Sequence, residues 1–296
     1  MHREWTDTGT AGWIAAARAR ESTRPDRLFD DPWAGALAGE RGRARLRASE
    51  QVGGENRFLP VRTRFFDDVV VEASSWAAQL VLLGAGLDTR AYRLRLPERM
   101  SVYEIDLPGL LALKQSALRT AGACAVCNRH VVAADLQADW SGALLTAGFD
   151  PGLPTVWLAE GLVFYLSRSA VERLLTQAAA LSTARAVIAL DAFGTGLLRL
   201  PALQPTVQRR AADGLEAPFC TDEPIALLGR CGWPECVITE PGQSRANYGR
   251  LPPLPDNWSG GTDPCMRTYL IVATRTEPGA EPDDDQQAPH DRQVPE

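Results

Sequence analysis

The chain has 296 residues, of which 45% are hydrophobic and 23% charged, so it can bury a sizeable core and is not expected to be disordered throughout. Its formal net charge of −6 and its isoelectric point near 5.3 argue against a dedicated nucleic-acid binder, which would normally carry a strongly basic face. This length accommodates one α/β domain, and we expect a single domain over residues 1–276.

Arginine supplies nearly all of the positive charge, and Lys114 is the only lysine in the chain. The planar guanidinium of arginine and the point charge of lysine are not interchangeable in a confined site. We therefore expect Lys114 to occupy a position at which arginine would not serve.

No segment has the roughly 20 consecutive apolar residues that span a bilayer, and the N-terminus lacks the features of a signal peptide. We therefore predict a cytoplasmic protein with no membrane partner. In that compartment the six cysteines are expected to be free thiols. Cys124, Cys127 and His130 could suggest a metal site. No second pair has matching spacing, however, so we favour a loop that leads into a strand.

Residues 1–58 are predicted to form a helical lid. The stretch Gly9–Arg20 is rich in alanine and arginine and is typical of a short helix. Asp31 followed by Pro32 is typical of the cap and first turn of a second helix. After a glycine loop, apolar residues recur at helical spacing from Leu59 onward, which predicts a long helix.

From residue 79 onward, short apolar runs alternate with helical segments. The runs predict five buried strands, at Gln79–Leu83, Ser101–Ile105, Arg129–Ala133, Thr155–Ala159 and Ala186–Leu190. Helical patterns lie between them, at Thr89–Leu94, Pro108–Thr120, Trp140–Ala147 and Ser169–Leu181. Such alternation is typical of right-handed βαβ units, and it predicts a parallel sheet with helices on both faces.

The last part of the chain departs from this alternation. Residues 197–231 have helical patterns that prolines interrupt, so we interpret them as an insertion above the sheet. Glu235–Glu240 and Arg267–Thr274 are predicted to close the sheet as an antiparallel pair, which gives an α/β fold with a mostly parallel, seven-stranded sheet. Residues 277–296 are rich in Pro, Asp and Gln and are predicted to be a disordered tail.

A glycine turn follows the first predicted strand, in the sequence Gly84-Ala85-Gly86-Leu87-Asp88. Glycine lets the backbone turn sharply and approach a ligand closely, since it has no β-carbon. Taken alone this signal is weak, and an ordinary tight turn is the alternative. The third glycine of the dinucleotide-binding fingerprint is missing, which disfavours a nicotinamide cofactor.

Acidic residues stand at the ends of the next strands. Glu104 and Asp106 close the second strand about 20 residues beyond the glycines, the spacing at which an acid accepts hydrogen bonds from ribose hydroxyls. Asp135 and the following Leu136 are suited to bind adenine, and Glu160 lies where the fourth strand leaves the sheet. Glu104 or Asp106 could instead cap a helix, and Asp135 could close an Asx turn. Because ligands bind beyond the carboxyl ends of strands in open α/β sheets, the series favours a nucleotide-like ligand.

Seven blocks of the chain occur in a characteristic order: Arg18–Ser22, Leu28–Pro32, Val61–Asp68, Leu82–Leu94, Tyr103–Pro108, Asp135-Leu136 and Ala159–Leu166. Together they resemble the leucine carboxyl methyltransferase family, in particular its bacterial branch of natural-product O-methyltransferases. The resemblance covers most of residues 10–190 and becomes loose after Leu197.

The resemblance implies a class I methyltransferase fold with S-adenosylmethionine as the cofactor. Arg62 would pair with the methionine carboxylate of the cofactor, which a planar guanidinium suits. Glu160 would lie near the amino group of the cofactor, and Tyr165 would border the methyl-transfer pocket as the catalytic residue. The implied cofactor-binding residues are Arg62, Gly84, Ala85, Gly86, Asp88, Glu104, Asp106, Asp135, Leu136 and Glu160.

The reaction that we expect is methyl transfer to a carboxylate of a small molecule, polyketide-like or another secondary metabolite. A carboxylate is already ionised at neutral pH, whereas a phenol, with a pKa of about 10, usually needs a positioned base such as histidine. His2 and His290 lie in predicted tails and His130 at the start of a strand, so no histidine is well placed. Asp, Glu or water could still deprotonate a hydroxyl, which leaves O-methylation of a phenol or hydroxyl as the alternative.

A carboxylate acceptor would need a cationic or hydrogen-bonding partner, for which the candidates are Arg90, Arg93, Arg199, Arg209 and Arg210. Several aromatic residues of the variable segments either line the substrate pocket or pack in the core: Trp13, Trp33, Phe193, Phe219, Trp233, Tyr248 and Trp258.

Two other classes of protein stay open at this point. A nicotinamide-dependent oxidoreductase would normally show the missing third glycine, and a non-catalytic cofactor-binding protein is not excluded by the sequence. We expect a small-molecule partner and no nucleic acid, and the sequence permits a homodimer.

Overall fold

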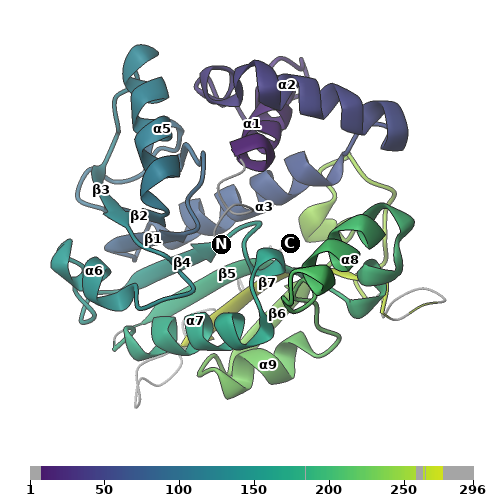
Figure 1. Cartoon of the computed structure of the whole chain (residues 1–296). Coiled ribbons are helices and arrows are strands. Elements are labelled where there is room, and N and C mark those ends of the chain that lie inside the picture. Colours follow the sequence, from purple (N-terminus) through teal and green to yellow (C-terminus); the bar gives the residue numbers. More distant parts are fainter. Residues whose placement is uncertain (1–7, 184, 258–262, 264, 276–296) are drawn as a thin grey trace, which may run out of the picture.

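The computed structural model describes residues 8–183, 185–257, 263 and 265–275. Seven strands form one sheet in the order β3-β2-β1-β4-β5-β7-β6 (Figure 1). They are β1 (Gln79–Leu83), β2 (Ser101–Asp106), β3 (Asn128–Ala133), β4 (Thr155–Ala159), β5 (Ala186–Phe193), β6 (Glu235–Thr239) and β7 (Thr268–Arg275). The first five pair in parallel, and β7 runs antiparallel to both of its neighbours. The predicted mostly parallel, seven-stranded α/β fold is confirmed.

The strand order reverses beside β1, which pairs with β2 on one side and with β4 on the other. Connections from the two sides therefore diverge above this point and leave a crevice at the carboxyl ends of the strands. The turn after β1 opens into this crevice, so the topology alone already places the predicted glycine turn at the position where open α/β sheets bind ligands.

Side chains alternate between the two faces of the sheet, and each face has its own helices. Val81 and Leu83 join a core with α6 (Ser141–Thr146), α7 (Arg168–Ala180) and α9 (Pro224–Arg230). Leu80 and Leu82 point to the other face and join a core with α3 (Phe58–Ala73) and α4 (Arg90–Arg93). Figure 1 shows α7 and α9 below the sheet and α3 above it. Because both faces are covered at the centre of the sheet, the central strands β1 and β4 are fully buried and mostly apolar, whereas the edge strands β3 and β6 are partly exposed.

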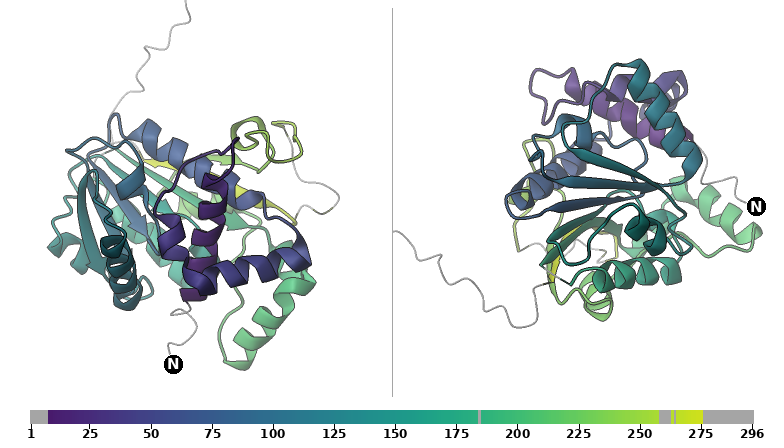
Figure 2. Two further views of the ribbon diagram at one scale, coloured as in Figure 1. Left: turned by 90° about the horizontal axis from the view of Figure 1, so that it is seen from above. Right: turned by 90° about the vertical axis from the view of Figure 1, so that its left-hand side faces the viewer.

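Two N-terminal helices, α1 (Thr8–Ser22) and α2 (Ala34–Gly53), pack against each other and cover α3 and α5 (Pro108–Thr120) on the same side of the molecule (Figure 2). We call this pair the N-terminal cover. Its second helix begins at Ala34, two residues later than Pro32. The N-cap position is therefore Trp33 and not the predicted Asp31, but the Asp31 carboxylate accepts hydrogen bonds from the N–H groups of Trp33 and Ala34 at the start of the helix.

The segment between β5 and β6 is helical but interrupted, as predicted. It contains the short 3₁₀ turns η2 (Thr195–Arg199) and η3 (Pro201–Leu203), followed by α8 (Gln204–Ala212) and α9. Two further 3₁₀ turns are η1 (Val163–Tyr165) after β4 and η4 (Ser244–Ala246) after β6.

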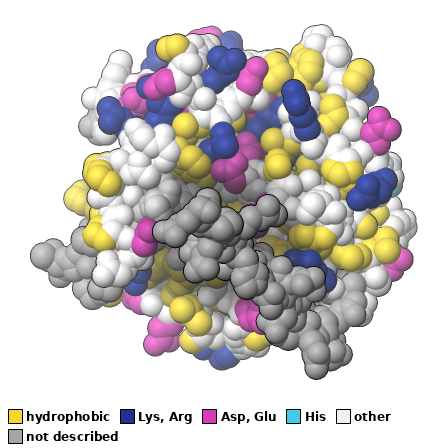
Figure 3. Space-filling view, turned by 180° about the vertical axis from the view of Figure 1, so that it is seen from behind, with side chains coloured by type: hydrophobic (Ala, Val, Ile, Leu, Met, Phe, Trp, Pro, Cys, Tyr) yellow, Lys and Arg dark blue, Asp and Glu magenta, His cyan; other side chains and the backbone are white. Residues whose placement is uncertain are grey.

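Some predictions concern residues outside the described part of the chain, namely the disordered tail, Trp258, His2 and His290. None of the described helices combines the length and the apolar character that a bilayer span requires. On the face seen in Figure 3, basic and acidic side chains are interspersed. The domain limits, the cytoplasmic location and the homodimer stay predictions.

The crossing of α1 and α2 generates a prediction about stability. The helices touch at Gly12 and Gly42, where a Cβ added to Gly42 would lie 2.4 Å from the carbonyl oxygen of Gly12. Gly42→Ala is therefore expected to lower the free energy of unfolding by about 1–3 kcal/mol through overpacking. Gly35→Ala is the matched control, because nothing lies within 4 Å of its added Cβ; Gly35 precedes and Gly42 follows the kink of α2 at Gly39. Urea unfolding measures the free energy of unfolding of both variants. Equal stability of the two would contradict the close contact between Gly12 and Gly42.

Candidate functional site

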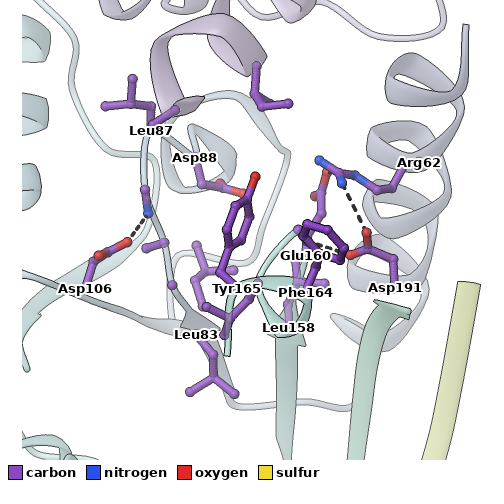
Figure 4. Close-up of a pocket in the computed structure, with 18 of the residues that line it drawn as sticks. Arg62, Leu83, Leu87, Asp88, Asp106, Leu158, Glu160, Phe164, Tyr165 and Asp191 are labelled. Carbon is purple, nitrogen blue, oxygen red and sulfur yellow. Dashed lines mark hydrogen bonds and ion pairs between the residues drawn. The ribbon is translucent and has the colours of Figure 1, made fainter. Parts of the chain in front are cut away.

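A cavity of about 740 Å³ opens at the carboxyl ends of β1, β2, β4 and β5, a volume within the usual range for small-molecule sites. The polar groups gather on one side, which we call the polar half, and come from the turn after β1, the ends of the other strands and Arg62 of α3. The remaining lining, which we call the apolar half, comes from α1, α3, η1, the end of β5 and the segment after it. In Figure 4, Asp106 lies on one side of the cavity, Arg62, Glu160 and Asp191 lie on the other, and Tyr165 stands between them.

The glycine turn lines the polar half. Gly84 and Gly86 have φ angles of 66° and 44°, in the left-handed region that favours glycine. A Cβ on Gly84 would lie 2.8 Å from the Leu162 side chain. The Ala85 N–H donates to the carbonyl oxygen of Ile105 at 2.9 Å, which ties the turn to β2. Glycine at position 84 is thus favoured by backbone conformation, whereas the Leu162 side chain could move aside, and the turn exposes its backbone to the cavity.

Asp106, the last residue of β2, also lines the cavity. Its carboxylate accepts hydrogen bonds from the N–H groups of Gly86 and Leu107, both at 2.7 Å. Burial raises the pKa of Asp106, against the effect of these two hydrogen bonds. The side chain therefore shapes the turn and presents a fixed acceptor to the cavity, and it does not cap α5, whose N-cap is Leu107.

Glu104 requires a correction, because the structure does not bring it into the cavity. Its side chain is fully buried beneath α5, with Oε2 2.8 Å from Lys114 Nζ and 2.5 Å from Arg129 Nη2. It lies two positions before Asp106 on β2, with only Ile105 between them, which places it further from the carboxyl end of the strand. Lys114, the only lysine, is likewise fully buried, in agreement with the expectation of a special position.

Asp135 and Leu136 line the same side of the cavity as Asp106. The Asp135 carboxylate accepts a hydrogen bond from the Gln137 N–H at 2.9 Å, so it does close an Asx turn. That bond uses one of the roughly four acceptor positions of the carboxylate, so others are left for a ligand.

Arg62 projects from α3 into the opposite side of the polar half. Nε donates to Glu160 Oε1 and Nη1 donates to Asp191 Oδ2, each at 3.1 Å. The third nitrogen, Nη2, donates no hydrogen bond to any residue in the described part of the chain and is not enclosed by protein atoms. A Cβ on Gly161 would lie 3.1 Å from this nitrogen, so a glycine is favoured here as well. The arrangement leaves one directed N–H donor group facing the cavity.

Glu160 is shared between two arginines. Oε1 accepts from Arg62, and Oε2 accepts from Arg90 Nη2 at 2.7 Å. Arg90 is buried and also bonds Asp67 and Asp88. Although burial opposes ionisation, the charges of Arg90 and Arg62 lower the pKa of Glu160, and Arg90 does the same for Asp88, whose pKa falls to about 2. Both carboxylates are therefore ionised and weakly basic.

Asp191 is a site residue that the sequence interpretation missed. It lies in β5 and lines the cavity, with Oδ1 accepting from the Gly161 N–H at 2.5 Å and Oδ2 accepting from Arg62. Burial raises its pKa against the charge of Arg62. A signal was present, since an acid directly follows the predicted strand Ala186–Leu190, as acids do at the other strand ends.

The apolar half is built around aromatic rings. Phe193 contacts Phe58 and Phe164, with ring centroids 6.4 and 5.8 Å apart. Trp13 of α1 lines the same half, together with Ile14, Leu197, Leu200 and Leu203. Of the seven aromatic residues named from the sequence, the described ones other than Trp13 and Phe193 pack away from the cavity. Tyr165 extends between the halves, and burial raises the pKa of its hydroxyl, which stays protonated at neutral pH.

The predicted cationic partners for an acceptor are not available in this geometry. Arg90 and Arg93 line the cavity, but both are bonded to Asp67. Arg199, Arg209 and Arg210 are not among the residues that line it. His130 stacks on Tyr103 at 4.6 Å, outside the cavity, and the described residues contain no group of His, Cys, Asp and Glu that could hold a metal ion.

Comparison with known proteins identifies the family of the chain. The model of the leucine carboxyl methyltransferase family matches residues 11–179. A protein from Frankia alni is 39% identical over 274 residues, which are 90% of this chain and 93% of that protein. A protein from Parafrankia sp. is 42% identical over 64% of this chain and 66% of its own length. Both are named as S-adenosyl-L-methionine-dependent methyltransferases.

Solved structures agree on the fold. A methyltransferase structure from Thermobifida fusca has a TM-score of 0.54 and 17% identity, and the match covers 85% of this chain and 94% of that one. The family match and the names of these relatives confirm the predicted enzyme class, the S-adenosylmethionine-dependent methyltransferases. The family model covers more than half of the chain, and the chain belongs to the leucine carboxyl methyltransferase family.

Proposed function

We propose that the chain transfers a methyl group from S-adenosylmethionine to a carboxylate of an apolar small molecule. The observation that carries the proposal is the state of the ionisable groups in the described cavity lining. Every arginine is paired with a carboxylate, and no side chain is a neutral base near pH 7. Such a site suits an acceptor that is already ionised.

The polar half fits the cofactor. Asp106 would accept hydrogen bonds from its ribose hydroxyls, and Asp135 with Leu136 would contact its adenine. Arg62 would meet its carboxylate through the Nη2 group that the described protein leaves unused, with Glu160 and Asp191 beside its amino group. Gly84 and Gly86 leave room for it along the turn. When bound, S-adenosylmethionine supplies a methyl group on a positively charged sulfur.

The protein's own contribution is to bind and orient the acceptor, since in-line displacement depends mainly on alignment. The cluster of Phe58, Phe164 and Phe193 would hold the apolar part of the acceptor. Tyr165 would donate a hydrogen bond to the carboxylate oxygen that does not react, because its raised pKa keeps the proton on the hydroxyl. Excluding water from this half strengthens that hydrogen bond.

An acceptor that is already a carboxylate needs no base. The described residues that line the cavity include no side chain well suited to act as one. Glu160 and Asp88 have lowered pKa values, and both oxygens of Asp106 and of Asp191 accept hydrogen bonds. A phenol, with a pKa of about 10, would find no histidine among the described lining residues. Phenol methylation is therefore the second candidate.

The role of Arg62 generates a prediction about cofactor affinity. Arg62→Ala is expected to raise the Kd for S-adenosylhomocysteine about 10- to 100-fold, because a charge-assisted hydrogen bond to the ligand carboxylate is lost. Arg64→Ala is the matched control, since Arg64 lies on the same helix and bonds Asp68 on its half-exposed face. Titration calorimetry measures the Kd of both variants for S-adenosylhomocysteine. An unchanged Kd in Arg62→Ala would contradict the proposed contact between Arg62 and the ligand carboxylate.

The raised pKa of Asp106 generates a prediction about pH. The ordinary pKa of an Asp carboxyl is about 4, and an Asp with a raised pKa becomes protonated at a higher pH than an ordinary one. A protonated carboxyl accepts hydrogen bonds from ribose less well. The affinity for S-adenosylhomocysteine is therefore expected to fall as the pH is lowered from neutral, and to begin falling at a higher pH than an ordinary carboxylate would cause. In Asp106→Asn the affinity is lower throughout and this dependence is weaker. The same pH dependence in both proteins would count against Asp106 as the ribose acceptor.

The choice of acceptor is tested by methyl transfer to matched pairs of aromatic acids and phenols. We expect methyl esters from the acids and little product from the phenols. In Tyr165→Phe we expect kcat/KM for the acids to fall about tenfold with no change in the Kd for S-adenosylhomocysteine, since only the acceptor loses a hydrogen bond. Turnover of phenols without ester formation would overturn the carboxylate proposal and leave the cofactor site intact.

A further inference from the structure

One buried carboxylate joins the two halves of the cavity without lining it. Asp31 lies in the connection between α1 and α2 and is 2% exposed. Oδ2 accepts hydrogen bonds from Arg18 Nε at 2.8 Å and from Thr89 Oγ1 at 2.7 Å. Oδ1 accepts from the N–H groups of residues 33 and 34 at the start of α2. A single side chain thus connects both helices of the N-terminal cover to the residue that follows the glycine turn.

These connections reach both halves of the cavity. Arg18 Nη2 donates to the carbonyl oxygen of Leu87 at 2.6 Å, so α1 holds the turn from one side of Asp88 while the Asp31–Thr89 hydrogen bond holds it from the other. Along α1, Ala11, Ile14 and Arg18 line the cavity at helical spacing. The face of α1 that borders the acceptor is therefore fixed at its C-terminal end to the turn that borders the cofactor.

We propose that Asp31 is a positioning residue that couples binding at the cofactor turn to the placement of α1 over the acceptor. The proposal rests on the cofactor site proposed above. A ligand that orders the turn also orders Leu87 and Thr89, and through Arg18 and Asp31 it orders α1. Such a path is a contiguous chain of polar contacts, and its coupling is a measurable free energy.

The charge of Asp31 is what makes this connection strong. Burial opposes its ionisation, but the charges of Arg18 and Arg93 lower its pKa, so it is a carboxylate at neutral pH. Arg93 Nε lies 3.9 Å from Oδ2 and also donates to Thr89 Oγ1. Asp31→Asn keeps the shape and removes the charge. Asp30→Asn is the matched control, since Asp30 is the exposed neighbour.

Hydrogen exchange of residues 8–22 in the full chain, with and without S-adenosylhomocysteine, tests the coupling. In the unchanged protein and in Asp30→Asn, the ligand is expected to slow exchange of α1 about fivefold or more. In Asp31→Asn, measured at ligand saturation, this slowing should disappear. A purely structural role would speed exchange equally with and without ligand and leave the ratio unchanged, which would overturn the proposal.

A second pair of variants keeps the test independent of whether Asp31→Asn folds. Thr89→Val removes the hydroxyl that bonds Asp31, whereas Thr89→Ser keeps a hydroxyl at this position. We expect the ligand-induced slowing of α1 to be reduced in the valine variant and kept in the serine variant. Equal slowing in both would contradict the coupling while the cofactor site stands. If the unchanged protein does not bind S-adenosylhomocysteine at all, the proposed function and this inference both fail.

Discussion

The site depends on the requirement that a buried charge be paired, because an isolated buried ion costs several kcal/mol to desolvate. Arg62 and Arg90 are buried and share Glu160 between them. Arg62 also holds Asp191, and Arg90 holds Asp67 and Asp88. These ion pairs fasten the ends of β4 and β5 to α3 and α4, and they fix the orientation of every polar group on that side of the cavity. Preorganisation of this kind is what a reaction governed by alignment requires.

The same pairing shapes the chemistry that the cavity can support. The described arginines that line it carry carboxylate partners, and the carboxylates that line it are engaged by arginine or by backbone N–H groups. What the polar half offers a ligand is therefore directional hydrogen bonding with little net charge. A zwitterionic cofactor end matches such a surface better than a strongly charged diphosphate does, in keeping with the missing third glycine of the turn.

Much of the fold could be predicted from the sequence because its signals are local. The apolar run Thr155–Ala159 and the helix Pro108–Thr120 have the predicted bounds, since flanking prolines and polar residues mark their ends. The glycine turn and Asp106 could be predicted for the same reason, because the turn follows β1 directly and Asp106 ends β2. The alternation of strands and helices was sufficient to predict the parallel sheet.

The remaining features depend on contacts between distant parts of the chain. Glu104 and Asp106 lie on the same face of β2. Glu104 nevertheless forms a buried ion pair beneath α5, whereas Asp106, at the end of the strand, lines the cavity. Asp191 was missed because β5 extends to Phe193, beyond its apolar run, and because its partner Arg62 is 129 positions away. Similarly, the sequence does not show that Arg90 is paired with carboxylates and is therefore not available to an acceptor.

A crystal structure with S-adenosylhomocysteine bound tests the central claim most directly. We expect the adenosine beside Asp106 and Asp135, and the amino-acid end against Arg62 Nη2, with the ion pairs from Arg62 to Glu160 and Asp191 intact. A ligand bound outside the cavity, or one whose carboxylate lies at Asp106 with the adenine toward Arg62, would contradict it.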